Sequence, residues 1–219
     1  MDGRIASRKE AGRKLAALLS SYKGRDDVMV LALPRGGVPV GYEIARALQA
    51  PLEIFFVRKV GVPLYPELAM GAVASGDVLL LDANMVREFG LSQREVDEAV
   101  ARSRKELERQ EEVFRPGRPG IDLSGKIAIL TDDGIATGHT MLAAIEAAKR
   151  LGAGKVLAAA GVAPASTVER IREKVEEAAC LMTPRDFRAV GLFYEDFSQV
   201  TDEQVRELLA AARRDEPAG

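Results

Sequence analysis

The sequence predicts an α/β fold in which a parallel sheet is covered by helices on both faces. Short apolar runs alternate with amphipathic, helix-like segments along most of the 219 residues. Most of these runs are apolar at every position, which is typical of strands buried on both faces of a parallel sheet. Ligands of such sheets bind beyond the carboxyl ends of the strands. The candidate site loops are therefore 34–37, 58–67 and 132–140.

The first half of the chain is expected to provide two strands of this sheet, a hairpin and three helices. Pro34-Arg-Gly-Gly37 interrupts the first apolar run, Ser75-Gly-Asp77 is a turn signal, and Ser92 with Glu95 is a capping-box pattern. In chain order we expect a helix over 4–22, a strand over 28–33, a helix over 38–48, a strand over 52–57, a hairpin over 69–81 and a long polar helix over 92–113.

The polar helix has two possible roles. Opposite charges stand four residues apart in it, at Glu98/Arg102, Arg102/Glu106 and Arg104/Glu108. Such a pattern is typical of a solvated helix face, and a partner-binding surface is the alternative. The following segment 115–120 contains two Pro-Gly turns.

The second half continues the alternation of strands and helices. Gly152 and Gly154 end one helix, and Thr201 with Gln204 begins the last one. We expect strands over 126–131, 156–162 and 179–182, and helices over 140–151, 166–178 and 202–213.

Composition excludes several classes of protein. A hydrophobic content of 47% excludes intrinsic disorder, and the length suggests one domain over 1–219. The net charge of −2 provides no overall basic field for a nucleic acid. The single cysteine, Cys180, excludes an internal disulfide. No cationic and apolar leader follows Met1 and no apolar run is long enough for a membrane span, so a cytoplasmic location is expected.

The single histidine, His139, limits the chemistry that the chain can perform. It excludes His-rich zinc sites and makes a Ser-His-Asp triad improbable. Carboxylates, cations and a bound metal are the expected chemical groups.

The segment 131–140 has the composition of a phosphate-binding loop. A buried strand leads into Asp132 and Asp133, and a loop of small residues then opens a helix, whose free N–H groups are an anion site. Gly134 and Gly138 permit tight turns and close backbone approach. The two acids would accept hydrogen bonds from hydroxyl groups or face a metal, so a ribose 5-phosphate fits. An ordinary capped turn is the alternative.

Two cationic segments follow other strands. Arg35 beside Gly36 and Gly37 offers a guanidinium and free backbone donors to a second phosphate group, and a β-turn with a surface arginine is the alternative. Arg58-Lys59 ends the next apolar run, where a solvated cationic turn is nearly as good an interpretation.

The run Asp132-Asp-Gly-Ile-Ala-Thr-Gly-His-Thr140 resembles the PRPP-binding signature of the type I phosphoribosyltransferases. Together with Pro34–Gly37 and Arg58-Lys59, the resemblance covers about residues 28–165, and the whole chain resembles phosphoribosyltransferases of unassigned substrate. It implies the type I phosphoribosyltransferase fold. The implied parts are a core over about 28–182, a substrate hood over 1–22 and 184–213, and an insertion over about 61–120 with a lid and the polar helix.

The resemblance also implies residue roles. Asp132 and Asp133 would hold the ribose hydroxyls and reach Mg²⁺ mostly through those hydroxyls or water. Arg35, Arg58 and Lys59 would bind pyrophosphate, with Arg35, Gly36 and Gly37 in a loop that often contains a non-proline cis peptide. The 5-phosphate would be bound by residues 135–140, which are Ile135, Ala136, Thr137, Gly138, His139 and Thr140, and Gly134 would belong to the same binding loop. His139 would contribute mainly its backbone, and a general-base role is the alternative.

Two further groups have an open interpretation. Tyr65 and Glu67 would belong to the mobile lid or to an ordinary loop. The aromatic residues Phe187, Phe193, Tyr194 and Phe197 would stack on a nucleobase in the hood or, as we favour, form part of the core.

The implied activity is Mg²⁺-dependent transfer of a phosphoribosyl group from PRPP to a nitrogen of a nucleobase or related amine, with release of pyrophosphate. The alternative is a PRPP- or nucleotide-sensing regulatory protein without turnover. The resemblance favours a homodimer, and no nucleic-acid or membrane partner is expected.

Overall fold

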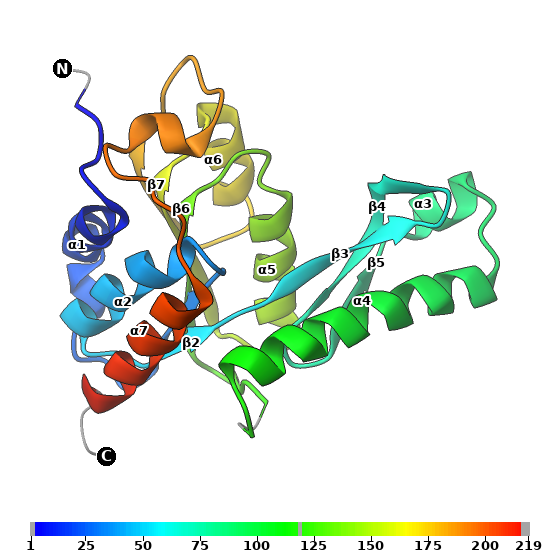
Figure 1. Cartoon of the computed structure of the whole chain (residues 1–219), viewed down its shortest axis with the longest axis horizontal. Helices are drawn as coiled ribbons and strands as arrows, with labels where there is room; N and C mark the ends of the chain where they lie inside the picture. The colour runs from blue at the N-terminus through cyan, green and yellow to red at the C-terminus, as the bar shows by residue number, and fades with distance from the viewer. Residues whose placement is uncertain (1–2, 118–119, 216–219) are drawn as a thin grey trace.

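The computed structural model describes residues 3–117 and 120–215. Its centre is a five-stranded parallel sheet in the order β2-β1-β6-β7-β8 (Figure 1). The strands are β1 (Val28–Ala32), β2 (Leu52–Ile54), β6 (Ile127–Gly134), β7 (Lys155–Val162) and β8 (Glu177–Met182). The α/β fold with a central parallel sheet is confirmed.

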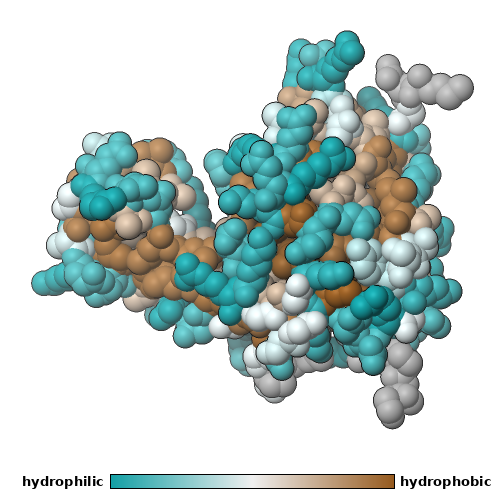
Figure 2. Space-filling model, turned by 180° about the vertical axis from the view of Figure 1, so that it is seen from behind, coloured by the Kyte–Doolittle hydropathy of each residue, from teal (hydrophilic) through white to brown (hydrophobic). Residues whose placement is uncertain are grey.

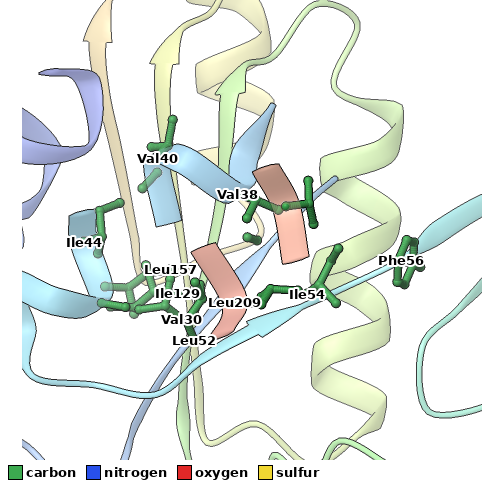
Figure 3. Close-up of a cluster of buried hydrophobic side chains, with 14 of the residues drawn as sticks. Val30, Val38, Val40, Ile44, Leu52, Ile54, Phe56, Ile129, Leu157 and Leu209 are labelled. Atoms are coloured by element: carbon green, nitrogen blue, oxygen red, sulfur yellow. The ribbon is translucent and has the colours of Figure 1, made fainter. Parts of the chain in front are cut away.

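Helices cover both faces of this sheet because successive strand residues point to opposite sides. Val30, Ile129 and Leu157 pack toward α2 and α7 in Figure 3, whereas Leu31 and Leu130 share a second buried cluster with residues of α5 and α6. The helices of this body are α1 (Arg8–Leu18), α2 (Gly37–Leu48), α5 (His139–Arg150), α6 (Ala165–Arg172) and α7 (Asp202–Asp215), with 3-10 turns η1 (Ser20–Tyr22) and η2 (Val190–Phe193).

Residues 57–114 form a second part of the molecule, which we call the arm. It contains the antiparallel sheet β3-β4-β5 and two helices, and it projects from the body in Figure 1. Its elements are β3 (Val57–Val62), β4 (Tyr65–Ala74), β5 (Val78–Leu81), α3 (Ala83–Glu88) and α4 (Gln93–Phe114). Figure 2 shows apolar surface along the arm, where Leu64, Leu68 and Leu81 are exposed.

The prediction of one strand over 52–57 is wrong. The chain leaves the parallel sheet after Ile54, and β3 begins a different sheet at Val57. The buried pair Phe55 and Phe56 links the two parts: the N–H of Phe55 donates to Ala32, and that of Phe56 to the hydroxyl of Ser75. Since the apolar run continues across both sheets, hydrophobicity alone does not mark the change.

The prediction of a loop over 58–67 is also wrong, because these residues belong mainly to β3 and β4. The two strands pair antiparallel from Val57/Ala74 to Val62/Tyr65, so only Pro63 and Leu64 connect them. The hairpin β4-β5 is confirmed, and β4 begins earlier than expected.

Other element boundaries differ by smaller amounts. The helix expected over 166–178 ends at Arg172, and β8 begins at Glu177, where the apolar residues 178–182 pair with β7. The helix expected from residue 4 begins at Arg8, because the Ser7 side chain caps it by accepting from the Glu10 N–H.

The long polar helix is confirmed as α4, including the capping box between Ser92 and Glu95. The expected charge pairs have other partners: Glu98 pairs with Arg94, Glu106 with Arg109, and Arg104 with Asp77 of the neighbouring turn. One side of α4 is buried against β3 through a set of mostly apolar residues, Val96, Ala99, Val100, Leu107 and Phe114. Its solvated face is therefore only part of its surface.

Among residues 3–117 and 120–215, no helix is both long and apolar enough to cross a membrane. The expected double turn over 115–120 lies partly outside the described residues, as does the start of the expected hood at residues 1–2.

Candidate active site at the carboxyl ends of the sheet

A cavity of about 370 Å³ lies where the carboxyl ends of β1 and β6 meet the base of the arm. Its walls come from five separate parts of the chain. They are Leu33, Pro34, Arg35, Phe55, Phe56, Val57, Arg58, Arg109, Gln110, Val113, Phe114, Asp132, Thr140 and Asp202. Arg35, Arg58, Asp132 and Thr140, which the sequence singled out, thus line one cavity.

Of the adjacent acids Asp132 and Asp133, Asp132 is the one that lines this cavity. It is half-buried, and its Oδ1 accepts a hydrogen bond of 2.8 Å from the backbone N–H of Asp133. Burial raises the pKa of the Asp132 carboxyl well above its usual range, and the adjacent negative charge of Asp133 raises it further. The charged form of Asp132 is therefore disfavoured until a hydroxyl group or a cation compensates it.

Asp133 is engaged by the protein. Its Oδ2 accepts a hydrogen bond of 2.7 Å from Nε of Arg8, and both side chains are 11% exposed. The Arg8 guanidinium also donates to the Ser198 carbonyl and lies 3.9 Å from the centroid of the Phe197 ring. The two acids therefore differ: Asp132 is directed to the cavity, and Asp133 joins β6 to α1. A ribose role for Asp133 stays a prediction.

The loop between β6 and α5 is held in place by α6. The Thr167 hydroxyl donates to the Ala136 carbonyl over 2.9 Å, and the Arg170 guanidinium donates to the Thr137 carbonyl over 3.3 Å. Gly138 precedes α5 at a φ of 80° and has no side chain that could cap the helix. The N-terminal N–H groups of α5 therefore remain available to an anion, which their position in the helix dipole also favours.

The expected 5-phosphate residues follow one another around this helix start. Ile135 is buried and its N–H donates to Val162, which anchors the loop to β7. The remaining side chains that reach solvent belong to Ala136, Thr137, His139 and Thr140. His139 is the first residue of α5, as its expected backbone role requires.

The loop 34–37 lies against the acid-bearing strand. The peptide bond between Pro34 and Arg35 is cis, as the resemblance implies. A Cβ atom at Gly36 would collide with the Asp133 carboxylate, and one at Gly37 would lie 2.5 Å from the Thr131 carbonyl oxygen. Both glycines are therefore required for this loop to approach β6.

Arg58 and Lys59 differ in their surroundings, as expected for successive residues of a strand. Arg58 lines both the cavity and a neighbouring groove of about 520 Å³ between the hairpin and α4. Lys59 lines only the groove, and its Nζ donates to the Glu67 carbonyl over 3.4 Å. The structure brings Arg58, and not Lys59, to the cavity with Asp132.

Sequence reasoning missed the contributions of α4 and α7. Arg109 and Gln110 enter the cavity from the end of α4, and Asp202 enters from the start of α7. The Arg35 Nε lies 2.8 Å from Asp202 Oδ1. A seven-residue spacing from Arg102 to Arg109 was visible in the sequence, but nothing local indicated where that face would point.

The two groups with an open interpretation lie outside this cavity. The Tyr65 ring contacts Phe89 within the arm at 5.6 Å between centroids, and Glu67 lies on β4. Of the aromatic cluster, Tyr194 is buried and donates to the Asp133 carbonyl over 2.6 Å, as the core interpretation predicts. Phe197 is 37% exposed, and the Arg8 guanidinium stacks over its ring.

Comparison with known proteins points to one family. A profile described as the phosphoribosyl transferase domain matches residues 4–195. A protein of Mycobacterium tuberculosis named "Putative phosphoribosyl transferase" is 45% identical over 208 residues, which are 95% of this chain and 47% of that protein. The chain thus spans about half the length of the curated relatives it matches. A ribose-phosphate pyrophosphokinase of Pyrococcus furiosus is 43% identical over 65 residues, 29% of this chain and 23% of that one.

A solved structure resembles nearly the whole chain. The crystal structure of a Thermus thermophilus protein has a TM-score of 0.84 and 40% sequence identity, and the match covers 95% of this chain and 98% of that one. The arm and the parallel sheet therefore occur together in an experimentally determined relative.

Proposed function

Because this chain belongs to the phosphoribosyl transferase domain family, we propose that it transfers a 5-phosphoribosyl group from PRPP to a nitrogen nucleophile and releases pyrophosphate. One observation carries the proposal. Arg35, Arg58, Asp132 and Thr140 line a single cavity beside the uncapped start of α5. This grouping of two cations, an acid and a helix N-terminus supports the proposal, because PRPP carries a diphosphate, ribose hydroxyls and a monophosphate.

The chemical roles follow from charge and position. The first-turn N–H groups of α5, with the hydroxyls of Thr137 and Thr140, bind the 5-phosphate. Asp132 accepts from the ribose hydroxyls and disposes the ring for attack at the anomeric carbon. Arg35 and Arg58 stabilise the negative charge that develops on the departing pyrophosphate. Fixed positions and charges thus supply the catalysis, without a histidine base.

The donors present are compatible with Mg²⁺ carried mainly by the substrate. Among the described residues, no group of three or more His, Cys, Asp or Glu side chains could hold a metal ion. Asp132 is the acid at the cavity that no cation pairs in the structure as described, and its disfavoured negative charge suits a cation nearby. Mg²⁺ commonly binds through one or two carboxylates together with water and phosphate oxygens. When bound, it would neutralise charge on the diphosphate.

The acceptor would enter from the side opposite the arm. Support comes from the contacts that join the chain ends there: the Ile5 N–H donates to the Phe193 carbonyl, and Arg8 donates to Ser198. These contacts join residues 5–8 to residues 193–198, and Arg8 also pairs with Asp133, which supports a hood built from the expected segments 1–22 and 184–213. We infer that the hood selects a nucleobase or related amine.

A direct test combines binding with turnover. Calorimetric titration with PRPP, with and without Mg²⁺, should detect binding at or below millimolar ligand. A screen of nucleobases and amines should then identify an acceptor that causes pyrophosphate release from PRPP. Absence of PRPP binding would refute the proposal. Tight binding with no release for any acceptor would favour the regulatory alternative.

The neighbouring cations Arg58 and Lys59 give a matched prediction. Arg58→Ala should weaken PRPP binding by about tenfold or more, because a hydrogen bond to a charged group contributes ~1.5–3 kcal/mol. Lys59→Ala removes the same charge one residue away, from a side chain that lines the groove and not the cavity. We expect a change below about threefold there, since solvent and salt screen the longer distance. Equal losses for both variants, measured by titration with PRPP, would contradict the placement of Arg58.

A further inference from the structure

Charged side chains of both signs line the cavity. Its cations are Arg35, Arg58 and Arg109; Asp202 of the same cavity pairs with Arg35, whereas Arg109 pairs with Glu106, which is not among the lining residues. Arg109 donates to both Glu106 oxygens, at 2.7 and 3.0 Å. Its pKa is raised mainly by this hydrogen bonding to Glu106, and Asp202 contributes to the rise. Asp202 is thus paired with Arg35 and near enough to Arg109 to affect it electrostatically.

Asp202 is positioned for Arg35 rather than needed for its own helix. The start of α7 is already capped, because the Thr201 hydroxyl accepts from the Gln204 N–H and the Gln204 side chain accepts from the Thr201 N–H. Glu203 supplies a second acid in the same turn for the helix dipole. The Asp202 carboxylate instead approaches the Arg35 Nε to 2.8 Å across the cavity.

We propose that Asp202 is the counter-ion of Arg35 before substrate binds and that the diphosphate of the substrate then takes its place on the guanidinium. This inference rests on the proposed function. The recorded contact joins the Arg35 Nε to Asp202 Oδ1, and a guanidinium binds carboxylate and phosphate oxygens through the same nitrogens. A diphosphate oxygen at the same position would compete with Asp202 directly.

The competition lowers the apparent affinity for the diphosphate. A ligand that must break the ion pair binds only to the fraction of molecules in which Arg35 is free. Half-exposed ion pairs stabilise by less than ~1 kcal/mol, so the pair should reduce affinity by a few-fold. Such a counter-ion would keep Arg35 ordered before binding and would help pyrophosphate to leave afterwards.

The experiment measures inorganic pyrophosphate binding by calorimetry, with and without Mg²⁺. Asp202→Asn should bind pyrophosphate about three- to tenfold more tightly than the wild type, from loss of the competitor and of its repulsion. Asp202→Glu, which restores a carboxylate, should return the affinity toward the wild-type value. The gain should decrease as salt is added.

The matched control is Glu203→Gln, which removes the same charge from the same helical turn at an exposed position outside the cavity. We expect less than about a twofold change in pyrophosphate affinity for it, because solvent and salt screen a charge at that position. A gain of binding is not what a damaged helix produces, so the readout separates a counter-ion from a structural role.

The outcomes distinguish this inference from the proposed function. If the wild type binds pyrophosphate and Asp202→Asn binds it equally or more weakly, the counter-ion role is refuted and the proposed function stands. An equal gain in Glu203→Gln would likewise refute it, in favour of a general field effect. If no form of the protein binds pyrophosphate, the proposed function fails and this inference with it.

Discussion

The Asp132→Asn variant should bind PRPP about ten- to a hundredfold more weakly than the wild type and yet melt at a higher temperature at neutral pH. The affinity falls because the amide loses the charge that strengthens hydrogen bonds from ribose hydroxyls, worth ~1.5–3 kcal/mol. The stability rises because burial and the charge of Asp133 disfavour the Asp132 carboxylate in the folded state.

The sign of the pH dependence follows from the raised pKa. Between the ordinary pKa of an aspartate and the raised value in the fold, the folded wild type binds more protons than the unfolded chain. The stability of the wild type therefore decreases as pH rises through this range. Asp132→Asn lacks this loss of stability. At about pH 8 its melting temperature should exceed that of the wild type by about 2–4 °C for each kcal/mol that the buried carboxylate costs, and the difference should vanish in acid.

Melting curves from about pH 4 to 8 and PRPP titrations at about pH 8 check both halves of this prediction. Glu203→Gln is the control for removal of a carboxylate outside the cavity. A variant that loses affinity and stability together would indicate that Asp132 supports the fold. A variant with unchanged affinity would exclude Asp132 from the ribose site.

The second large effect is expected at Gly37. In Gly37→Ala the new Cβ would lie 2.5 Å from the Thr131 carbonyl oxygen and 3.0 Å from the Asp132 Cα. Both are backbone atoms of β6, so the loop 34–37 must move away from the strand. We expect a loss of ~1–3 kcal/mol in the free energy of unfolding, as for other overpacked sites. PRPP turnover should fall by about a hundredfold, because Arg35 moves with the loop.

Gly120→Ala is the control, since a Cβ there lies within 4 Å of no atom of the described residues apart from its chain neighbours. Thermal melting and PRPP-dependent pyrophosphate release should both be close to the wild type in that variant. If Gly37→Ala behaves like Gly120→Ala, the close packing of the loop on β6 does not determine the site.

Local sequence predicted the parts of the molecule that depend on neighbouring residues. The buried strands and the segment from Asp132 to Thr140 were recognisable because strand, acids, small residues and helix follow one another directly, although β6 continues to Gly134 and not only to the predicted end at residue 131. The pairing of Asp133 with Arg8 and of Arg35 with Asp202 was not predictable in this way. These partners are 125 residues apart in the first case, and they meet only when α1 and α7 pack on the body.

The change of sheet at Phe55 and Phe56 was missed for a different physical reason. An uninterrupted apolar run is favoured in a strand of either sheet, so nothing in it distinguishes one continuous strand from two shorter ones. Because the strand was predicted to end at residue 57, Arg58 and Lys59 were both assigned to a loop at the site. Both residues belong to β3, where successive side chains alternate sides, and only Arg58 lines the cavity. The roles predicted for Arg58 and Lys59 thus depended on the boundary between β2 and β3, which the hydrophobic pattern does not mark.

The origin of the cavity walls has a mechanical consequence. Arg58 and Arg109 belong to the arm, while Arg35, Asp132 and Asp202 belong to the body, and the chain passes between the two only at 55–57 and after 114. A diphosphate held from both sides would cross-link these parts by electrostatic contact. Binding of the diphosphate would then stabilise the arrangement of the arm on the body, and release of the anion would remove that stabilisation.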